Sequence, residues 1–185
     1  MIVWLVRHGE ADWPRGMALG RADPPLSRHG EDQARALADR LADRPIAAVY
    51  SSDLRRALAT AAAVAQRLGL TVEVVPDLRE LDFGPWEGRR LADLWQEAPD
   101  EAREWEADIR RTPSAFAESL PQLARRVAGF ADALRSTRLG AAEEVAVVAH
   151  LGSLTALHAE LSGNDIASSF RDVRFELGSE IRLRC

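Results

Sequence analysis

Ile2-Val3-Trp4-Leu5-Val6-Arg7-His8 opens the sequence with five apolar residues that run directly into a cation and an imidazole. An apolar run of this length that ends in polar residues is typical of a buried strand. It is much shorter than the roughly 20 apolar residues of a membrane span, and too short for the core of a signal peptide. We therefore predict an inner strand over residues 2–6, with His8 just past its carboxyl end.

Three more short apolar runs are predicted to form inner strands, over residues 46–50, 72–75 and 145–149. Four other stretches repeat apolar residues with the period of an α-helix, over residues 34–41, 54–68, 123–134 and 152–162. Alternation of short strands with amphipathic helices is typical of layered α/β domains. We therefore predict a three-layer α/β/α fold around a mostly parallel central sheet.

The ends of two of these helices carry recognisable signals. Ser119 and Gln122 have the spacing of a capping box at the start of the third helix. Gly69 directly follows the second helix, as expected for a residue that ends a helix in the left-handed conformation.

Two regions depart from the strand–helix alternation. Residues 173–177 and 181–183 alternate with period two around Gly178-Ser179, which predicts a hairpin at the sheet edge. Residues 84–121 are rich in Trp, Glu and Arg and are broken by prolines, so we predict a helical insertion over the end of the sheet that holds the site. No repeat or break in composition divides the chain, so residues 1–185 are predicted to form a single domain.

The composition restricts the partners of the protein. The 185 residues are 46% hydrophobic and carry a net charge of −5, with both signs of charge spread along the chain. This pattern offers no basic face for nucleic acid and no segment for a membrane. The one cysteine, Cys185, has no partner for a disulfide, which predicts a reducing, cytoplasmic location. The oligomeric state is left open, with a homodimer as one option.

Two histidines are expected at one edge of the predicted sheet. His8 follows the first strand and His150 follows the apolar run 145–149. Ligands of open α/β sheets bind at the carboxyl ends of the strands, so these imidazoles can face one pocket. The alternative is a chance pair of histidines at strand ends, because position alone is a weak signal.

Cations and a carboxylate are predicted close to these histidines. Arg7 precedes His8, and Arg56 lies in the first turn of the helix over residues 54–68. Guanidinium groups and helix N-termini both bind anions such as phosphate, so an anion is the expected ligand, although such arginines are often simply solvated. Glu80, beyond the third strand, can transfer a proton to a leaving oxygen, or it can form an ion pair with Arg79 or with an arginine of the pocket; its spacing leaves these roles open.

Five motifs then occur in a fixed order along nearly the whole chain: 5–10 (LVRHGE), 20–27 (GRADPPLS), 51–57 (SSDLRRA) with Thr60-Ala61, 78–88 (LRELDFGPWEG) and 148–150 (VAH). In wording and order they resemble the histidine phosphatase (phosphoglycerate mutase-like) superfamily.

This resemblance implies a metal-independent phosphoric monoester hydrolase of the histidine acid phosphatase type, which needs no cofactor. His8 would attack phosphorus and become a phosphohistidine, and Glu80 would protonate the leaving oxygen and later activate water. The phosphoryl oxygens would be held by the following groups: Arg7, Arg56, His150 and the backbone of Leu151. Arg21 and Trp13 are candidate contacts to the rest of a small phosphorylated metabolite, and Arg55 is predicted to lie on the helix surface.

The sequence also departs from the family pattern. Ala11 and Pro14 stand where the family usually has Thr and Asn, so a side-chain contact to phosphate is lost. Leu151 directly follows the second histidine, His150, at a position where the family usually has Gly. The Leu151 side chain must therefore fit beside the phosphate. These departures keep open a second reading, a module that binds phosphorylated ligands with weak turnover.

Several substrates and activities remain open. The run 81–88 and the short chain resemble the α-ribazole phosphatase branch, which acts on a cobalamin precursor. Broad-specificity phosphatases and phosphoglycerate mutases are the alternatives, the mutases being usually longer. A metallohydrolase with His8, Glu10, Asp12 and His150 as ligands is disfavoured because Arg7 would repel the cation. Three tryptophans of the insertion could stack on a base or belong to the core: Trp86, Trp95 and Trp105.

Overall fold

The central element of the computed structural model, which describes residues 1–137 and 143–185, is a five-stranded sheet in the order β3-β2-β4-β1-β5. Its strands are β1 (Ile2–Arg7), β2 (Ile46–Ser51), β3 (Val72–Val74), β4 (Glu144–Ala149) and β5 (Glu180–Arg184). Strands β1 to β4 run parallel to one another, whereas β5 runs antiparallel to β1. The predicted mostly parallel sheet is confirmed.

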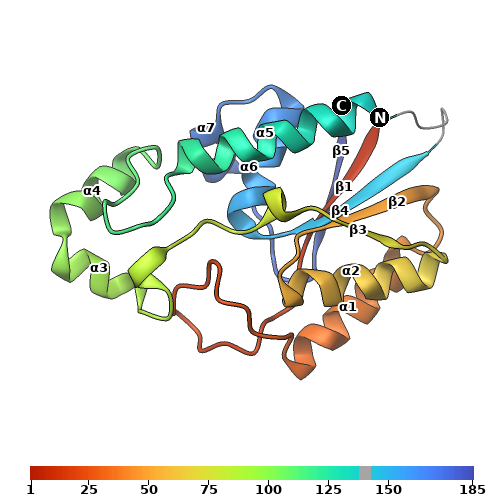
Figure 1. Cartoon of the computed structure of the whole chain (residues 1–185), viewed down its shortest axis with the longest axis horizontal. Helices are drawn as coiled ribbons and strands as arrows, with labels where there is room; N and C mark the ends of the chain where they lie inside the picture. The colour runs from red at the N-terminus through yellow and green to blue at the C-terminus, as the bar shows by residue number, and fades with distance from the viewer. Residues whose placement is uncertain (138–142) are drawn as a thin grey trace.

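Helices cover both faces of this sheet (Figure 1). One face is covered by α1 (Arg28–Leu41) and α2 (Arg55–Leu68); the other is covered by α5 (Leu120–Ser136), α6 (Leu151–Ser162) and α7 (Ile166–Asp172). Each face of the sheet has its own hydrophobic core, and successive residues of β1 point alternately into one or the other. Val3 and Leu5 lie in the core under α5 and α6, and Trp4 and Val6 lie in the core under α1 and α2. Because a strand buried on both faces needs apolar residues at every position, the opening run has no polar alternation.

The predicted helix-end signals act as expected. The Ser119 and Gln122 side chains form the capping box of α5. Gly69 ends α2 in the left-handed region, with φ 71°, which a glycine adopts without steric cost.

The predicted C-terminal hairpin is wrong in its first arm. Residues 173–177 form no strand, and α7, which the sequence reasoning did not predict, precedes them. Phe175 is buried in the core, and its carbonyl accepts a hydrogen bond from Nη1 of Arg7 at 2.7 Å. The Gly178 N–H donates to the carbonyl of His8 at 3.0 Å. The backbone groups of this segment therefore bind the end of β1, and β5 alone forms the edge of the sheet next to β1.

The segment 84–121 is helical, as predicted. A short 3-10 helix (Gly84–Trp86) is followed by α3 (Leu91–Glu97) and α4 (Pro99–Ala107), which extend beyond the carboxyl ends of the parallel strands (Figure 1). Another 3-10 helix (Pro76–Leu78) follows β3. The insertion therefore lies at the end of the sheet where the predicted site residues gather.

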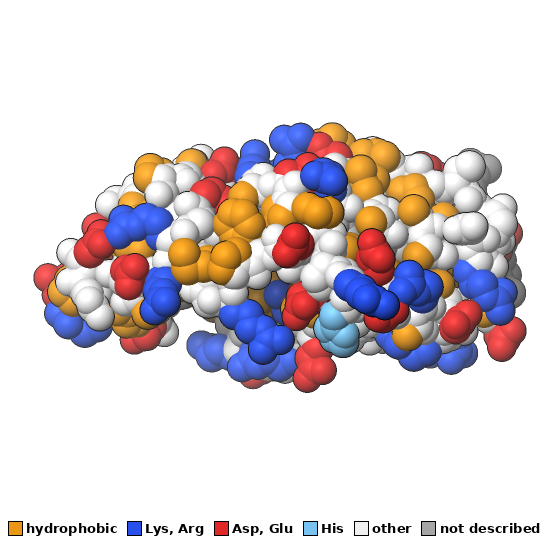
Figure 2. Space-filling view, turned by 90° about the horizontal axis from the view of Figure 1, so that it is seen from below, with side chains coloured by type: hydrophobic (Ala, Val, Ile, Leu, Met, Phe, Trp, Pro, Cys, Tyr) orange, Lys and Arg blue, Asp and Glu red, His pale blue; other side chains and the backbone are white. Residues whose placement is uncertain are grey.

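The surface carries both signs of charge. Figure 2 shows basic and acidic side chains interspersed over the face seen from below in Figure 1. None of the helices in the described part of the chain is long and apolar enough to cross a bilayer.

Candidate active site

The register of the sheet brings the two strand-end histidines together. Arg7 on β1 pairs with Ala149 on the neighbouring β4, so the residues that follow, His8 and His150, leave the sheet side by side. Their ring centroids are 4.9 Å apart, with the planes inclined at 59°. Both side chains are buried, with exposed fractions of 5% for His8 and 0% for His150.

His8 is held with one ring nitrogen prepared for attack. Its Nδ1 lies 2.7 Å from the carbonyl oxygen of Gly9, so Nδ1 carries the hydrogen and Nε2 keeps its lone pair. Nε of Arg56 donates to that Nε2 at 3.2 Å. Burial, together with the charges of Arg56 and Arg7, lowers the pKa of His8 to about 3. The ring is therefore neutral at neutral pH, the state in which an imidazole acts as a nucleophile.

The Arg-His-Gly triplet needs its glycine for close packing. A Cβ on Gly9 would lie 2.4 Å from the carbonyl oxygen of Gly30, at the start of α1. On its other side, the loop that follows His8 contacts α2, because the Gly9 N–H donates to the Thr60 hydroxyl at 3.1 Å. The loop after β1 is thus clamped between α1 and α2.

Arg56 is a fully buried cation at the start of α2. Its Nη1 donates to the carbonyl of Ala22 at 2.8 Å and its Nη2 to the carbonyl of Gly20 at 2.7 Å. Burial lowers its pKa, and the carboxylate of Glu80 opposes that change. A guanidinium remains charged even so, and the side chain of the preceding Arg55 is exposed, as predicted.

Arg7 and His150 present buried nitrogens that lack partners. Nε2 of His150 lies 2.9 Å from the hydroxyl oxygen of Ser52, and burial, next to His8 and Arg56, holds the pKa of His150 well below its usual value. Among the described residues, no group accepts or donates at Nδ1 of His150 or Nε of Arg7. Buried nitrogens without partners are costly, so an anion bound beside them would be stabilised.

Glu80 faces the same space as His8. Both line a pocket of about 550 Å³, together with Arg7 and Trp13. Glu80 is buried, with an exposed fraction of 8%, and its two carboxylate oxygens each accept from the backbone N–H of Gly152 at 3.0 Å. A carboxylate in this position can exchange a proton with a group bound in front of His8.

Arg126 of α5 supports the segment that carries Glu80. Its Nη2 donates to the backbone carbonyl of Glu80 at 3.0 Å, and its Nη1 donates to the carbonyl of Asp77 at 2.6 Å. The same guanidinium also donates to the Glu118 carboxylate, from Nε at 2.7 Å and from Nη2 at 2.8 Å. Arg126 was not predicted as a site residue, because its position in the helix carries no motif.

Ser52 was also not predicted as a partner of His150. A signal for it was present, because Ser52 directly follows β2 just as His8 follows β1. Its N–H also donates to the carbonyl of Val148 on β4 at 3.1 Å.

The two residues predicted to contact the rest of the substrate, Trp13 and Arg21, differ in their position relative to the pocket of His8. Trp13 lines the pocket of His8, and its Nε1 is buried without a partner in the described chain. Arg21 is absent from the described lining of that pocket, and its Nη2 instead donates to Glu118 at 3.3 Å. Leu151 is the first residue of α6, where backbone N–H groups have no partner within the helix, and its side chain is 38% exposed.

No cluster of three or more His, Cys, Asp or Glu side chains suited to a metal ion occurs within residues 1–137 and 143–185. The four ligands considered for a metallohydrolase, His8, Glu10, Asp12 and His150, therefore do not form such a cluster there.

Comparison with known proteins identifies the family. The family model described as histidine phosphatase superfamily (branch 1) matches residues 3–184. The chain belongs to this superfamily. The resemblance seen in the five motifs is confirmed, and the family places the chain among the phosphoric monoester hydrolases.

Histidine phosphatases with three different named activities are similar to this chain. Phosphoserine phosphatase 1 of Hydrogenobacter thermophilus is 32% identical over 164 residues, which cover 88% of this chain and 77% of that protein. Adenosylcobalamin/α-ribazole phosphatase of Escherichia coli is 34% identical over 164 residues, covering 88% and 80%. A mycobacterial glucosyl-3-phosphoglycerate phosphatase, solved in complex with inorganic phosphate, superposes with a TM-score of 0.88 at 31% identity, covering 99% and 89%.

Proposed function

We propose that this histidine phosphatase hydrolyses phosphomonoesters of small metabolites through a phosphohistidine at Nε2 of His8. The observation that carries the proposal is the state of the His8 ring, which is neutral, has its lone pair on Nε2, and lies beside the Arg56 guanidinium. A phosphoryl group bound there would replace the ring nitrogen as the partner of Nε of Arg56.

In the first step, Nε2 of His8 forms a bond to phosphorus while the bond to the ester oxygen breaks. Glu80 gives a proton to that oxygen, so the alcohol leaves neutral. The imidazole becomes positively charged, and the Gly9 carbonyl, which accepts from Nδ1–H at 2.7 Å, stabilises that charge. Arg7, Arg56, His150 and the backbone N–H of Leu151 would surround the three phosphoryl oxygens, where charge accumulates in the transition state.

In the second step, water attacks the phosphohistidine. Glu80, now a carboxylate, removes a proton from the water as its oxygen bonds to phosphorus. The bond between phosphorus and Nε2 breaks, and its electron pair returns to the ring. Inorganic phosphate leaves, and His8 is again neutral with its hydrogen on Nδ1.

For the physiological substrate we take α-ribazole 5′-phosphate as the first candidate. The motif over residues 81–88 and the similarity to the Escherichia coli enzyme support it. Phosphoserine and glucosyl-3-phosphoglycerate, named for two other relatives, are the competing candidates. A comparison of kcat/KM for these three compounds and 3-phosphoglycerate would rank them, and equal, slow rates would remove the support for α-ribazole phosphate.

The chemistry is tested with His8→Ala and, as a matched control, His29→Ala, which changes an exposed histidine on α1. We expect His8→Ala to abolish release of p-nitrophenol from p-nitrophenyl phosphate, and His29→Ala to retain it. Brief reaction with ³²P-labelled substrate should leave an acid-labile, base-stable label on the wild type but not on His8→Ala. A wild type that binds phosphate yet shows no release above His8→Ala would instead identify a binding module.

A further inference from the structure

A second, apolar cavity of about 260 Å³ adjoins the pocket of His8. Its walls come from segments far apart in the sequence, with Phe83 directly before the insertion, Trp105 within it and Phe170 on α7. Ile109 and Leu151 are among its other apolar lining residues. Among the described residues that line it, Glu80 is the one that carries a charge.

Glu80 connects the two cavities, because it lines both of them. In the proposed function, on which this inference rests, Glu80 gives its proton to the ester oxygen. That oxygen must therefore lie between His8 and Glu80. The alcohol attached to it can then extend past Glu80 into the apolar cavity.

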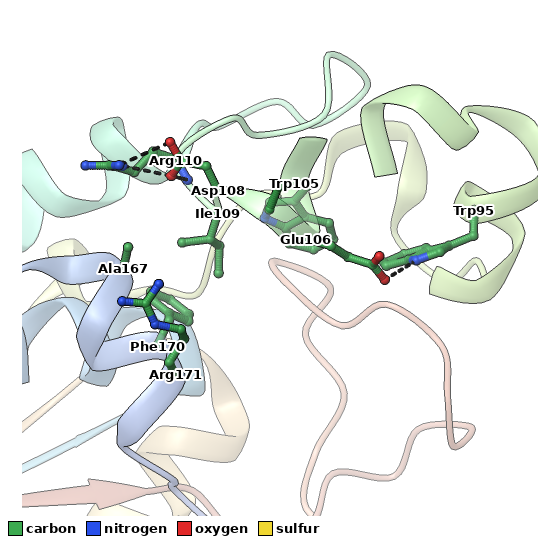
Figure 3. A pocket seen from close by; sticks show the side chains of 10 residues that line it. Trp95, Trp105, Glu106, Asp108, Ile109, Arg110, Ala167, Phe170 and Arg171 are labelled. Atoms are coloured by element: carbon green, nitrogen blue, oxygen red, sulfur yellow. Dashed lines mark hydrogen bonds and ion pairs between the residues drawn. The ribbon is translucent and has the colours of Figure 1, made fainter. Parts of the chain in front are cut away.

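The cavity also has an outer extension. A pocket of about 510 Å³ shares Trp105, Ile109 and Phe170 with it. Figure 3 shows this outer pocket between the insertion on one side and Phe170 with its α7 neighbours on the other. Polar groups at its rim already bind one another: Nε1 of Trp95 donates to Glu106 at 2.6 Å, and Nε of Arg110 donates to Asp108 at 2.8 Å.

We propose that the preferred substrates are phosphomonoesters whose alcohol carries an uncharged, ring-shaped apolar group, held in this cavity. A cavity of about 150 Å³ is enough to hold benzene, so 260 Å³ accommodates a bicyclic ring. The ammonium and carboxylate of phosphoserine would lose their hydration there without gaining partners. An apolar ring would instead be transferred from water to contacts with aromatic side chains.

The test compares two substrates with the same kind of leaving oxygen. 2-(1-Naphthyl)ethyl phosphate and ethyl phosphate are both esters of primary alcohols, so they differ chiefly in the ring. We expect kcat/KM of the wild type to be at least about tenfold higher for the naphthyl compound, and O-phosphoserine to react no faster than ethyl phosphate.

A variant of the cavity wall localises the effect. Ile109→Asn should lower kcat/KM for the naphthyl compound by about tenfold while leaving that for ethyl phosphate unchanged, which also shows that the variant is folded. Val74→Asn is the matched control, since Val74 is an exposed apolar residue on β3 and should tolerate the change with both substrates.

Two results would overturn this inference. One is equal kcat/KM for the two compounds, and the other is a naphthyl preference that Ile109→Asn leaves intact. Either result can be obtained with an active, His8-dependent enzyme, so it would leave the phosphohistidine mechanism standing. If the phosphohistidine mechanism itself were wrong, no substrate would show phosphate release that depends on His8.

Discussion

Both carboxylate oxygens of Glu80 accept a hydrogen bond from the backbone N–H of Gly152, each at 3.0 Å. This contact needs a glycine, because a Cβ at position 152 would lie 2.3 Å from Oε1 of Glu80. We therefore expect Gly152→Ala to displace the carboxylate. Its kcat/KM for alkyl phosphates should fall by about 100-fold, the typical cost of a displacement of about 1 Å in a catalytic site.

The nature of the substrate and a second glycine provide the controls for this variant. p-Nitrophenol leaves without much help from an acid, so hydrolysis of p-nitrophenyl phosphate should be much less affected. Gly129 lies in α5 with nothing within 4 Å of an added Cβ, and Gly129→Ala should keep full activity. It should also stabilise the protein, by about 0.8 kcal/mol from helix propensity. Equal losses with both classes of substrate would contradict the proposed acid role of Glu80.

Arg126 is expected to act as a positioning residue for Glu80. Arg126→Met removes the hydrogen bonds to the carbonyls of Asp77 and Glu80 and leaves the buried Glu118 with one fewer partner. We expect a loss of about tenfold in kcat for alkyl phosphates, with a smaller effect on p-nitrophenyl phosphate. A purely structural role would instead lower the rates for both substrates by the same factor.

The neighbouring Arg125 offers a matched control for Arg126, because it lies on the same helix with its side chain exposed. Arg125→Met should leave rates and stability unchanged. Urea unfolding of Arg126→Met should show a loss of about 2 kcal/mol in the free energy of unfolding, since a partly buried ion pair is broken. An Arg126→Met protein as stable and as active as wild type would refute the positioning role.

Arg56 and Arg55 form a natural pair for testing the phosphate site. Arg56→Lys keeps a charge but cannot reproduce the fork that binds Gly20, Ala22 and His8 together. We expect kcat/KM to fall by at least about 100-fold, the usual effect of removing a donor aimed at transition-state charge. Arg55→Lys, on the exposed side of the same helical turn, should lie within about twofold of wild type. Steady-state kinetics on one phosphomonoester decides between these outcomes.

The low pKa of His8 predicts how stability depends on pH. Its pKa is about 3 in the folded protein and about 6.5 in an unfolded chain, because folding buries the ring beside Arg56 and Arg7. Between these values the unfolded state binds a proton that the folded state does not. The contribution of His8 to the free energy of unfolding is therefore at its full value above about pH 6.5. It is lost as the pH falls toward 3, by about 1.4 kcal/mol per pH unit.

Urea unfolding at pH 6 and pH 5 measures this contribution. His8→Asn should lose about 1 kcal/mol less than wild type over that step, because the titrating ring is gone. His29→Asn, which changes an exposed ring, should match the wild type. Identical pH dependence in His8→Asn and wild type would mean that folding does not lower the pKa of His8.

Local features of the sequence were enough to predict much of the fold. The apolar runs of β1, β2 and β4 and the stripe of α5 depend on residues within a few positions of one another. Strand and helix periodicity, capping and helix-ending glycines are all read over such short distances. The positions of His8 and His150 at strand ends followed from the same runs, and the order of the five motifs indicated the family.

Contacts between distant parts of the chain were beyond such reasoning. The spacing of the imidazoles depends on β4 entering the sheet between β1 and β2, which no local pattern specifies. Residues 173–177 alternate like a strand, yet the buried Phe175 and the carbonyl that binds Arg7 hold them against the site. The contact between Glu80 and Gly152 and the apolar cavity beyond it likewise join separate segments. Short-range periodicity sets backbone conformation, whereas the folded path of the whole chain sets which side chains meet.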